Sequence, residues 1–219
     1  MNPSVENLRD IQLRYPNLFP YFIEFIFNPA AYLHPSRRFE LLPEIPEKIW
    51  NIPRVQGRIS NLLIQKIQMN VNGIWEVSHC KWALALLPTS RLNRLARHIG
   101  AIITASEIRS SLSRENVLEW KQRLGSDAYA FAMNSASLLP RIIISQEISA
   151  TNYPESIGYS FIYKSIEDFP KDMKERFLLK IPSNCAAALT EINKANLGVQ
   201  AVFEILEREW YSLFETSSQ

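Results

Sequence analysis

Histidine and cysteine are the residues of this chain whose spacing we consider first for a nucleophile, a base or a metal ligand. His79 and Cys80 are adjacent, and a cysteine beside a histidine can form a catalytic dyad. Zinc needs three or four converging ligands, whereas adjacent helical residues point about 100° apart. The chain has no GxGxxG, Walker or GxSxG sequence. We therefore predict no metal site, no cofactor and no enzyme activity, and interpret Cys80 as a core thiol; an enzyme using His34 or the His79–Cys80 pair is the alternative.

A row of basic residues on one predicted helix face could instead bind a partner. The row comprises Arg91, Arg94, Arg97 and His98. Nucleic-acid-binding domains usually carry a marked basic excess, because neutralised phosphates supply much of the affinity. Here the net charge of the chain is only +2. The row therefore fits a solvated face or a protein-docking patch better than a nucleic-acid site, and we expect His98 to be exposed.

The stretch FNPAAYLHPSRR, residues 27–38, contains two prolines, a tyrosine, a histidine and paired arginines. Pro29 is expected to end the apolar helix before it, so that the AAY segment turns the chain. The ring of Tyr32 can pack while its hydroxyl makes one hydrogen bond. Pro35 is predicted to open a short helix at its first turn. His34 then has a structural hydrogen-bonding role, and the stretch is a corner clamped by an aromatic residue.

Helical periodicity dominates the elements that must position these groups. Proline is concentrated in the first 53 residues, which predicts short helical turns there, one of them over 18–27. The clearest later helix is expected over 89–112, followed by one that Ser113 caps and Gly125 stops. In 54–70 the expected apolar face includes Ile59, Leu62 and Leu63. For 153–169 a helix is favoured, with a strand as the alternative. Further helices are expected over 78–88, 127–140, 171–181, 183–195 and 199–215.

These elements predict an all-α or mostly α fold of about eight to ten helices. We expect one domain over residues 1–219, a multi-helix bundle on whose body, 54–219, the proline-rich segment 1–53 packs. The N-terminus lacks the apolar core of a signal peptide, and the longest apolar run is about 10 residues where a bilayer span needs about 20. Cys80 and Cys185 are therefore interpreted as buried thiols in a reducing cytoplasm.

The residues of the corner resemble a known family. Phe27, Pro29, Tyr32 and His34 are similar to the early F-x-P-A-x-Y-x-H signature of the SctK (YscK-type) proteins of bacterial type III secretion systems. The stretch 95–132, with its leucine-rich helix and the following small-residue helix, resembles the middle of that family. The LLKIP at 178–182 is similar to a late element, so the resemblance spans most of the chain.

The resemblance implies an adaptor in the bacterial cytoplasm, at the inner-membrane face of the secretion apparatus. Such proteins link the cytoplasmic domain of the SctD ring protein to the SctQ pods, in one assembly with SctL and SctN. The basic candidates for partner binding are Arg37, Arg38, Arg91, Arg94 and Arg97. An acidic C-terminal helix with Glu204, Glu207 and Glu209 is the candidate for the pod side. A helix-turn-helix DNA-binding regulator, built on residues 89–124, is the alternative function.

Overall fold

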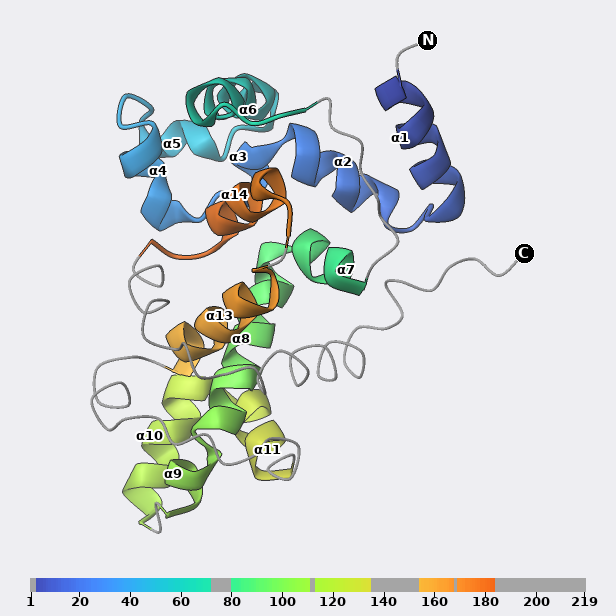
Figure 1. Ribbon diagram of the computed structural model, residues 1–219. Helices are drawn as coiled ribbons and strands as arrows, with labels where there is room; N and C mark the ends of the chain where they lie inside the picture. Colours follow the sequence, from blue (N-terminus) through green and yellow to red (C-terminus); the bar gives the residue numbers. More distant parts are fainter. Residues whose placement is uncertain (1–2, 72–79, 111–112, 135–153, 168, 184–219) are drawn as a thin grey trace. The chain divides into compact units, whose positions relative to one another are not determined.

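Every regular element that the structure describes is an α-helix. The computed structural model describes residues 3–71, 80–110, 113–134, 154–167 and 169–183, which contain thirteen helices and no strand (Figure 1). The all-α prediction is therefore confirmed. The described residues alone hold more helices than the eight to ten expected for the whole chain, because the prolines divide the N-terminal quarter into short helices that each begin anew.

The helices form two compact units. The first unit holds α1 to α7 and α14, and the second holds α8 to α11 and α13. The first unit is thus discontinuous in the chain, because α14 comes after the described helices of the second unit. The expectation of one domain over residues 1–219 stays a prediction.

Proline residues set the helix starts in the N-terminal quarter. After α1 (Pro3–Arg14) come α2 (Phe19–Phe27), α3 (Pro29–Tyr32), α4 (Pro35–Leu41), α5 (Glu47–Trp50) and α6 (Pro53–Ile67). In α2, α3, α4 and α6 a proline occupies the first turn, where its missing N–H costs no hydrogen bond and its fixed φ suits the helix. Pro35 was expected to open a helix and does so. Pro29 also opens one, so AAY is the body of α3 rather than a plain turn.

The core of the first unit is built where α3 packs against α6, α14 against α3, and α2 against α3 and α7 (Cys80–Leu86). Its large, fully buried side chains include Phe22, Phe25, Trp50, Leu63 and Phe177. Leu62 departs from the expected apolar face of α6, since 47% of its surface is exposed. It adjoins buried Leu63 in the sequence but lies about 100° away from it around the helix.

The second unit consists of α8 (Thr89–Ile103), α9 (Ala105–Ser110), α10 (Arg114–Leu124), α11 (Ser126–Asn134) and α13 (Pro154–Ser165). The single helix expected over 89–112 is divided at Thr104. The Thr104 hydroxyl donates to the Gly100 carbonyl oxygen at 2.9 Å, a back-bond that often bends helices. Ser113 and Gly125 bound α10 as predicted: the Ser113 hydroxyl accepts the Asn116 amide, and Gly125 has φ of 82°.

Residues 154–165 form the helix that was favoured over a strand. Their β-branched and aromatic content suggested a strand, yet this helix is buried on most of its sides, and an all-round buried helix carries such residues. Among the described residues, no helix combines the length and the apolar character needed to cross a bilayer.

Candidate functional site

The corner predicted in residues 27–38 is a set of internal contacts in the first unit. Tyr32 is buried, stacks on Phe25 with ring centroids 5.6 Å apart, and donates its hydroxyl to the Phe25 carbonyl oxygen at 2.8 Å. Burial raises the pKa of the Tyr32 phenol, so the hydroxyl remains a donor. Tyr32 therefore clamps the end of α2 against α3, as the sequence indicated. Phe27 remains 38% exposed, whereas Pro29 is buried.

A serine of α6 completes the corner from the other side. The Ser60 hydroxyl accepts the Ala30 amide at 3.1 Å and donates to Asn28 Oδ1 at 2.6 Å. Ser60 is fully buried. It satisfies the amide of Ala30 in the first turn of α3, which has no side-chain cap of its own. The segment between α2 and α3 is thus fixed to α6.

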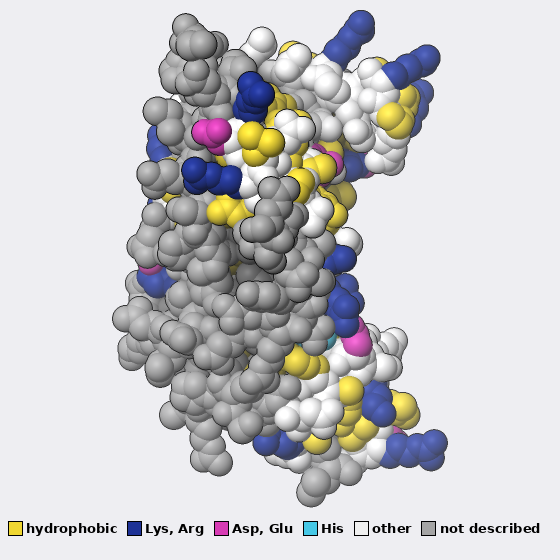
Figure 2. All heavy atoms as spheres, turned by 90° about the vertical axis from the view of Figure 1, so that its right-hand side faces the viewer, with side chains coloured by type: hydrophobic (Ala, Val, Ile, Leu, Met, Phe, Trp, Pro, Cys, Tyr) yellow, Lys and Arg dark blue, Asp and Glu magenta, His cyan; other side chains and the backbone are white. Residues whose placement is uncertain are grey.

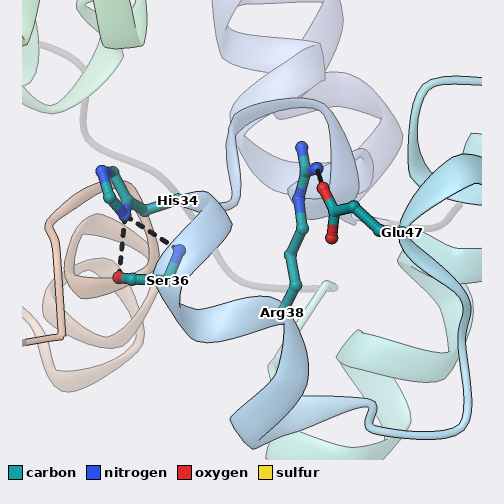
Figure 3. A network of polar contacts seen from close by, with 4 residues as sticks. All are labelled: His34, Ser36, Arg38 and Glu47. Atoms are coloured by element: carbon teal, nitrogen blue, oxygen red, sulfur yellow. Dashed lines mark hydrogen bonds and ion pairs between the residues drawn. The ribbon is translucent and has the colours of Figure 1, made fainter.

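His34 caps α4 and also joins it to α14 (Lys171–Lys180). Its amide donates to the Leu179 carbonyl oxygen at 2.8 Å. Its Nδ1 accepts the Ser36 amide at 3.2 Å and lies 2.8 Å from Ser36 Oγ (Figure 3). Burial, and then the charges of Arg37 and Arg38, lower the pKa of His34, which favours the neutral imidazole that an accepting Nδ1 requires. These contacts support the structural role expected for His34.

The paired arginines after Pro35 have partners inside the same unit. The Arg37 Nε donates to the Ile181 carbonyl oxygen at 2.6 Å. Arg38 forms an ion pair with Glu47 (Figure 3), and its guanidinium lies 5.2 Å from the centroid of the Trp50 ring. The Arg38 side chain is only 14% exposed. Both arginines thus hold elements of the first unit together, and their role in partner binding stays a prediction.

Sequence reasoning missed two buried cations on α14, Arg176 and Lys180. Lys180 Nζ donates to the carbonyl oxygens of Ala85 at 2.6 Å and Leu87 at 3.0 Å. It also lies over the rings of Phe25 and Tyr32, 4.8 and 5.1 Å from their centroids. The signal was present in the sequence, because Arg176 and Lys180 occupy apolar-stripe positions in the same helical register as buried Met173 and Phe177.

Arg176 binds backbone from two distant segments. Its Nη2 donates to the Asn70 carbonyl oxygen at 2.9 Å and to that of Ile26 at 3.3 Å. Asn70 follows the end of α6, and Ile26 lies in the last turn of α2, where helical carbonyls lack intrahelical donors. Arg176 therefore ties α14 to the ends of two other helices of the first unit.

The predicted basic face of α8 is present, and acidic groups of its own unit balance it in part. Arg94 Nε lies 3.3 Å from Asp127 Oδ2, with both side chains about half exposed. Arg97 is half-buried, its Nε has no hydrogen-bond partner among the described residues, and its charge acts on Glu155. Burial raises the pKa of Glu155, and Arg97 opposes that rise. Arg91 is half-buried.

The pKa of Asp127 is affected by His98 and Arg94 of the same face. Burial acts to raise the pKa of its carboxyl, but the Ala128 amide, His98 and Arg94 outweigh burial, so the pKa is lowered. Asp127 therefore stays ionised opposite Arg94 at neutral pH. This pair lies at the surface, where an ion pair contributes little to stability, about 0–1 kcal/mol.

His98 is not exposed as expected but 98% buried, since only 2% of its surface is accessible. Its Nδ1 donates to the Arg94 carbonyl oxygen at 2.8 Å, and its ring meets Phe131 of α11 edge-on with centroids 4.8 Å apart. The helical pattern placed His98 beside the arginines but could not indicate that α11 covers this side of α8. His98 is thus part of the packing between the two helices.

The remaining candidates give no site in the described part of the chain. No group of three or more His, Cys, Asp or Glu there could hold a metal ion. Cys80 is the first residue of α7. His79, Cys185, Glu204, Glu207 and Glu209 lie outside the described residues. On the face drawn in Figure 2, basic side chains of the described residues are interspersed with hydrophobic and uncharged ones.

Comparison with known proteins identifies one family. The model of the family described as YOP proteins translocation protein K (YscK) matches residues 19–200, well over half of the chain. No curated protein and no solved structure matches the chain. The matched range includes the corner, the basic face of α8 and both buried cations of α14.

Proposed function

The chain belongs to the YscK family, and from this premise we propose that it is a non-enzymatic adaptor of a type III secretion sorting platform. Family membership implies a role in type III secretion, and the family is a structural component of that assembly. In the proposal, the protein links the cytoplasmic domain of the SctD ring protein to the SctQ pods. It then works in the cytoplasm at the inner-membrane face, in one assembly with SctL and SctN.

The family match over residues 19–200 is the observation that carries this proposal. The contacts of the corner support it, because His34, one of the two histidines considered for an enzyme, caps α4 and accepts a backbone amide. Tyr32 likewise serves the join between α2 and α3. An adaptor needs such fixed joints, since its helices must hold two binding faces in place.

We infer that the ring protein binds the exposed part of the basic face of α8. Arg94 is the best candidate there, because its exposed ion pair with Asp127 can open at little cost when a partner carboxylate approaches. Arg91 lies on the same side of the helix. Arg97 is a weaker candidate, since it is half-buried beside Glu155.

The test is reconstitution from purified components. The protein is mixed with the SctD cytoplasmic domain, or with SctQ, from the same genome, and the mixture is separated by size-exclusion chromatography. We expect a stable complex with each. Failure of a folded, helical sample to bind either protein would refute the adaptor function. Salt-dependent retention on a DNA duplex in that case would favour the helix-turn-helix regulator.

The variant Arg91→Gln/Arg94→Gln tests the ring-facing surface in the same assay. We expect it to weaken the SctD complex and to leave SctQ binding unchanged. Wild-type binding to both partners would remove α8 from the interface while leaving the adaptor function intact. Circular dichroism of the variant is the control for folding.

A further inference from the structure

The amine of Lys180 joins the end of α14 to the end of α7. Its Nζ donates to the carbonyl oxygens of Ala85 at 2.6 Å and Leu87 at 3.0 Å. The helix α7 ends before Pro88, which has no N–H with which to continue it, and carbonyls at the end of a helix lack intrahelical donors. Lys180 therefore supplies hydrogen bonds that the chain around the end of α7 does not make for itself.

The two segments that Lys180 joins are adjacent to the points where the chain leaves the first unit and returns to it. The first unit is left after Thr89, just beyond α7, and α14 is the next described helix that belongs to it. Lys180, Ala85 and Leu87 all belong to the first unit. The joint therefore ties together the two segments of the first unit between which the helices of the second unit are inserted in the chain.

The surroundings of the Lys180 amine suit both of its protonation states. A neutral amine has two N–H groups, which is enough for the two carbonyl oxygens. An ammonium has three, and its charge is also favoured by the rings of Phe25 and Tyr32, whose centroids lie 4.8 and 5.1 Å from Nζ. Lys180 is only 3% exposed and forms no ion pair with a described residue. The amine can therefore titrate inside the folded protein.

Few charged groups face this amine among the described residues. Glu24 of α2 favours the ammonium through its charge, whereas Tyr32 of α3 is a neutral donor, because burial raises the pKa of its phenol. The described side chains of α7 are all apolar. Arg176, four residues earlier on α14, is a like charge at neighbour spacing. Burial outweighs Glu24 and lowers the pKa of Lys180 to about 7.

The last residues of α14 have anchors of their own, separate from those of the preceding turns. The His34 amide donates to the Leu179 carbonyl oxygen at 2.8 Å, and the Arg37 Nε donates to the Ile181 carbonyl oxygen at 2.6 Å. One turn earlier, Arg176 binds the ends of α2 and α6. Residues 178–183 are therefore the part of this segment that can open without releasing Arg176.

We propose that Lys180 is a proton-controlled latch, in which the neutral amine holds residues 178–183 against the end of α7 and protonation favours a locally open state of these residues. In the open state the amine lies in water and binds its proton more tightly. Opening is therefore favoured as the pH falls from about 10.5, the pKa of the amine in water, to about 7, its pKa in the closed state. Below about pH 7 both states are protonated, and the equilibrium stays constant. The inference goes beyond the adaptor function and does not rest on it.

Amide hydrogen exchange of the full chain, followed by NMR and corrected for intrinsic exchange at each pH, tests the latch. The reporter is the His34 amide, because its hydrogen bond to Leu179 breaks when residues 178–183 open. Its protection should rise roughly fiftyfold from pH 7 to pH 9. At pH 7 it should be at least about tenfold less protected than the amide of Leu63, a fully buried residue of α6. Equal protection of the two amides would mean that Lys180 is exposed only by global unfolding, and would overturn the latch.

Three variants assign the pH dependence to one amine. Lys180→Met cannot titrate, and Lys180→Arg keeps donors but stays charged, so both should lose the rise in His34 protection. Lys171→Met is the control, because it removes a lysine of the same helix whose side chain is 85% exposed, and it should behave like wild type. If Lys180→Arg does not fold, the comparison with Lys180→Met decides alone.

Two results would overturn the inference. The first is a rise in His34 protection that persists in Lys180→Met, since another group would then control the opening. The second comes from a direct NMR titration of the Lys180 side chain in wild type. A midpoint near 10.5 would show that the amine keeps the proton affinity that it has in water, whereas the latch requires a midpoint near 7.

Discussion

Gly158 of α13 lies so close to Ala96 of α8 that a Cβ atom at residue 158 would stand 1.8 Å from the Ala96 carbonyl oxygen. The same close approach occurs from the other helix: a Cβ atom at Gly100 of α8 would stand 1.8 Å from the carbonyl oxygen of Pro154 of α13. In both cases the obstacle is backbone, which cannot move aside as a flexible side chain can. Two glycines therefore set the distance between α8 and α13 in the second unit.

Gly158→Ala and Gly100→Ala should each destabilise the protein. The added methyl group forces the two helices apart, and overpacking of this kind costs about 1–3 kcal/mol or more. Urea unfolding followed by circular dichroism measures the loss, which should appear as a lower midpoint for each variant.

Gly57→Ala is the matched control, because Gly57 lies within α6 and, outside the adjoining helix backbone, no atom lies within 4 Å of the position that a Cβ would take. Alanine there removes the entropic cost of a mid-helix glycine and should raise the free energy of unfolding by about 0.5–1 kcal/mol. If all three variants changed stability alike, the close crossing of α8 and α13 would be wrong.

Lys180 should make the stability of the protein depend on pH in an unusual window. Burial lowers the pKa of its ammonium to about 7 from 10.5, and the charge of Glu24 opposes this shift only in part. Between these two values the unfolded chain holds the proton that the folded protein has released. Stability from this group therefore rises as the pH rises through the window, and is constant below about pH 7.

The comparison with Lys180→Met isolates this effect, since every other group titrates in both proteins. From about pH 7 to about pH 9, wild type should gain on the order of 2 kcal/mol of unfolding free energy relative to the variant. Urea titrations at several pH values measure the difference. Parallel pH profiles of the two proteins would show that Lys180 keeps its ordinary pKa when folded.

Gln68→Gly should stabilise the end of α6. Gln68 adopts φ of 57°, the left-handed conformation, and the Met69 amide closes the helix onto the Ile64 carbonyl oxygen at 3.0 Å. A non-glycine residue in that conformation costs about 1 kcal/mol, which glycine avoids. Thermal unfolding should show a higher midpoint. Gln65→Gly, within the same helix, should lower it by a similar amount; a lower midpoint for Gln68→Gly as well would contradict the assigned cap.

The parts of the fold that depend on local chemistry could be predicted from the sequence. Ser113 and Gly125 bound α10 because a cap hydroxyl and a positive φ act within one turn of the chain. Pro35 starts α4 for the same kind of local reason. Tyr32 was expected to pack its ring and to make one hydrogen bond, and its hydroxyl donates to the carbonyl oxygen of Phe25, seven residues earlier in the chain.

The burial of individual side chains could not be predicted where it depends on contacts between helices far apart in the sequence. His98 and Leu62 were both assigned from the periodicity of their own helices, and both were assigned to the wrong environment. Phe131 of α11 covers His98, and no local pattern near residue 98 encodes that contact. Likewise, the ion pair between Arg94 and Asp127 forms because the fold brings α11 beside α8. The sequence alone therefore suggested more uncompensated positive charge on the basic face of α8 than the structure has.

Ser60→Ala tests whether the family signature in the corner is structural. Without the hydroxyl, the buried Ala30 amide loses its acceptor and Asn28 Oδ1 loses a donor, which should cost about 1–3 kcal/mol in urea unfolding. Ser160→Ala is the control, because among the described residues that hydroxyl donates only to the Ser156 carbonyl four residues earlier in its own helix, and its loss should cost little.

The same variant separates stability from recognition. Below its unfolding transition, Ser60→Ala should bind the SctD cytoplasmic domain and SctQ with wild-type affinity, because Ser60 is fully buried and cannot touch a partner. Binding is measured at low temperature, where the variant is folded by circular dichroism. Weakened binding at unchanged stability would mean that the corner formed by α2, α3 and α6 is itself a recognition surface rather than the joint that holds one in place.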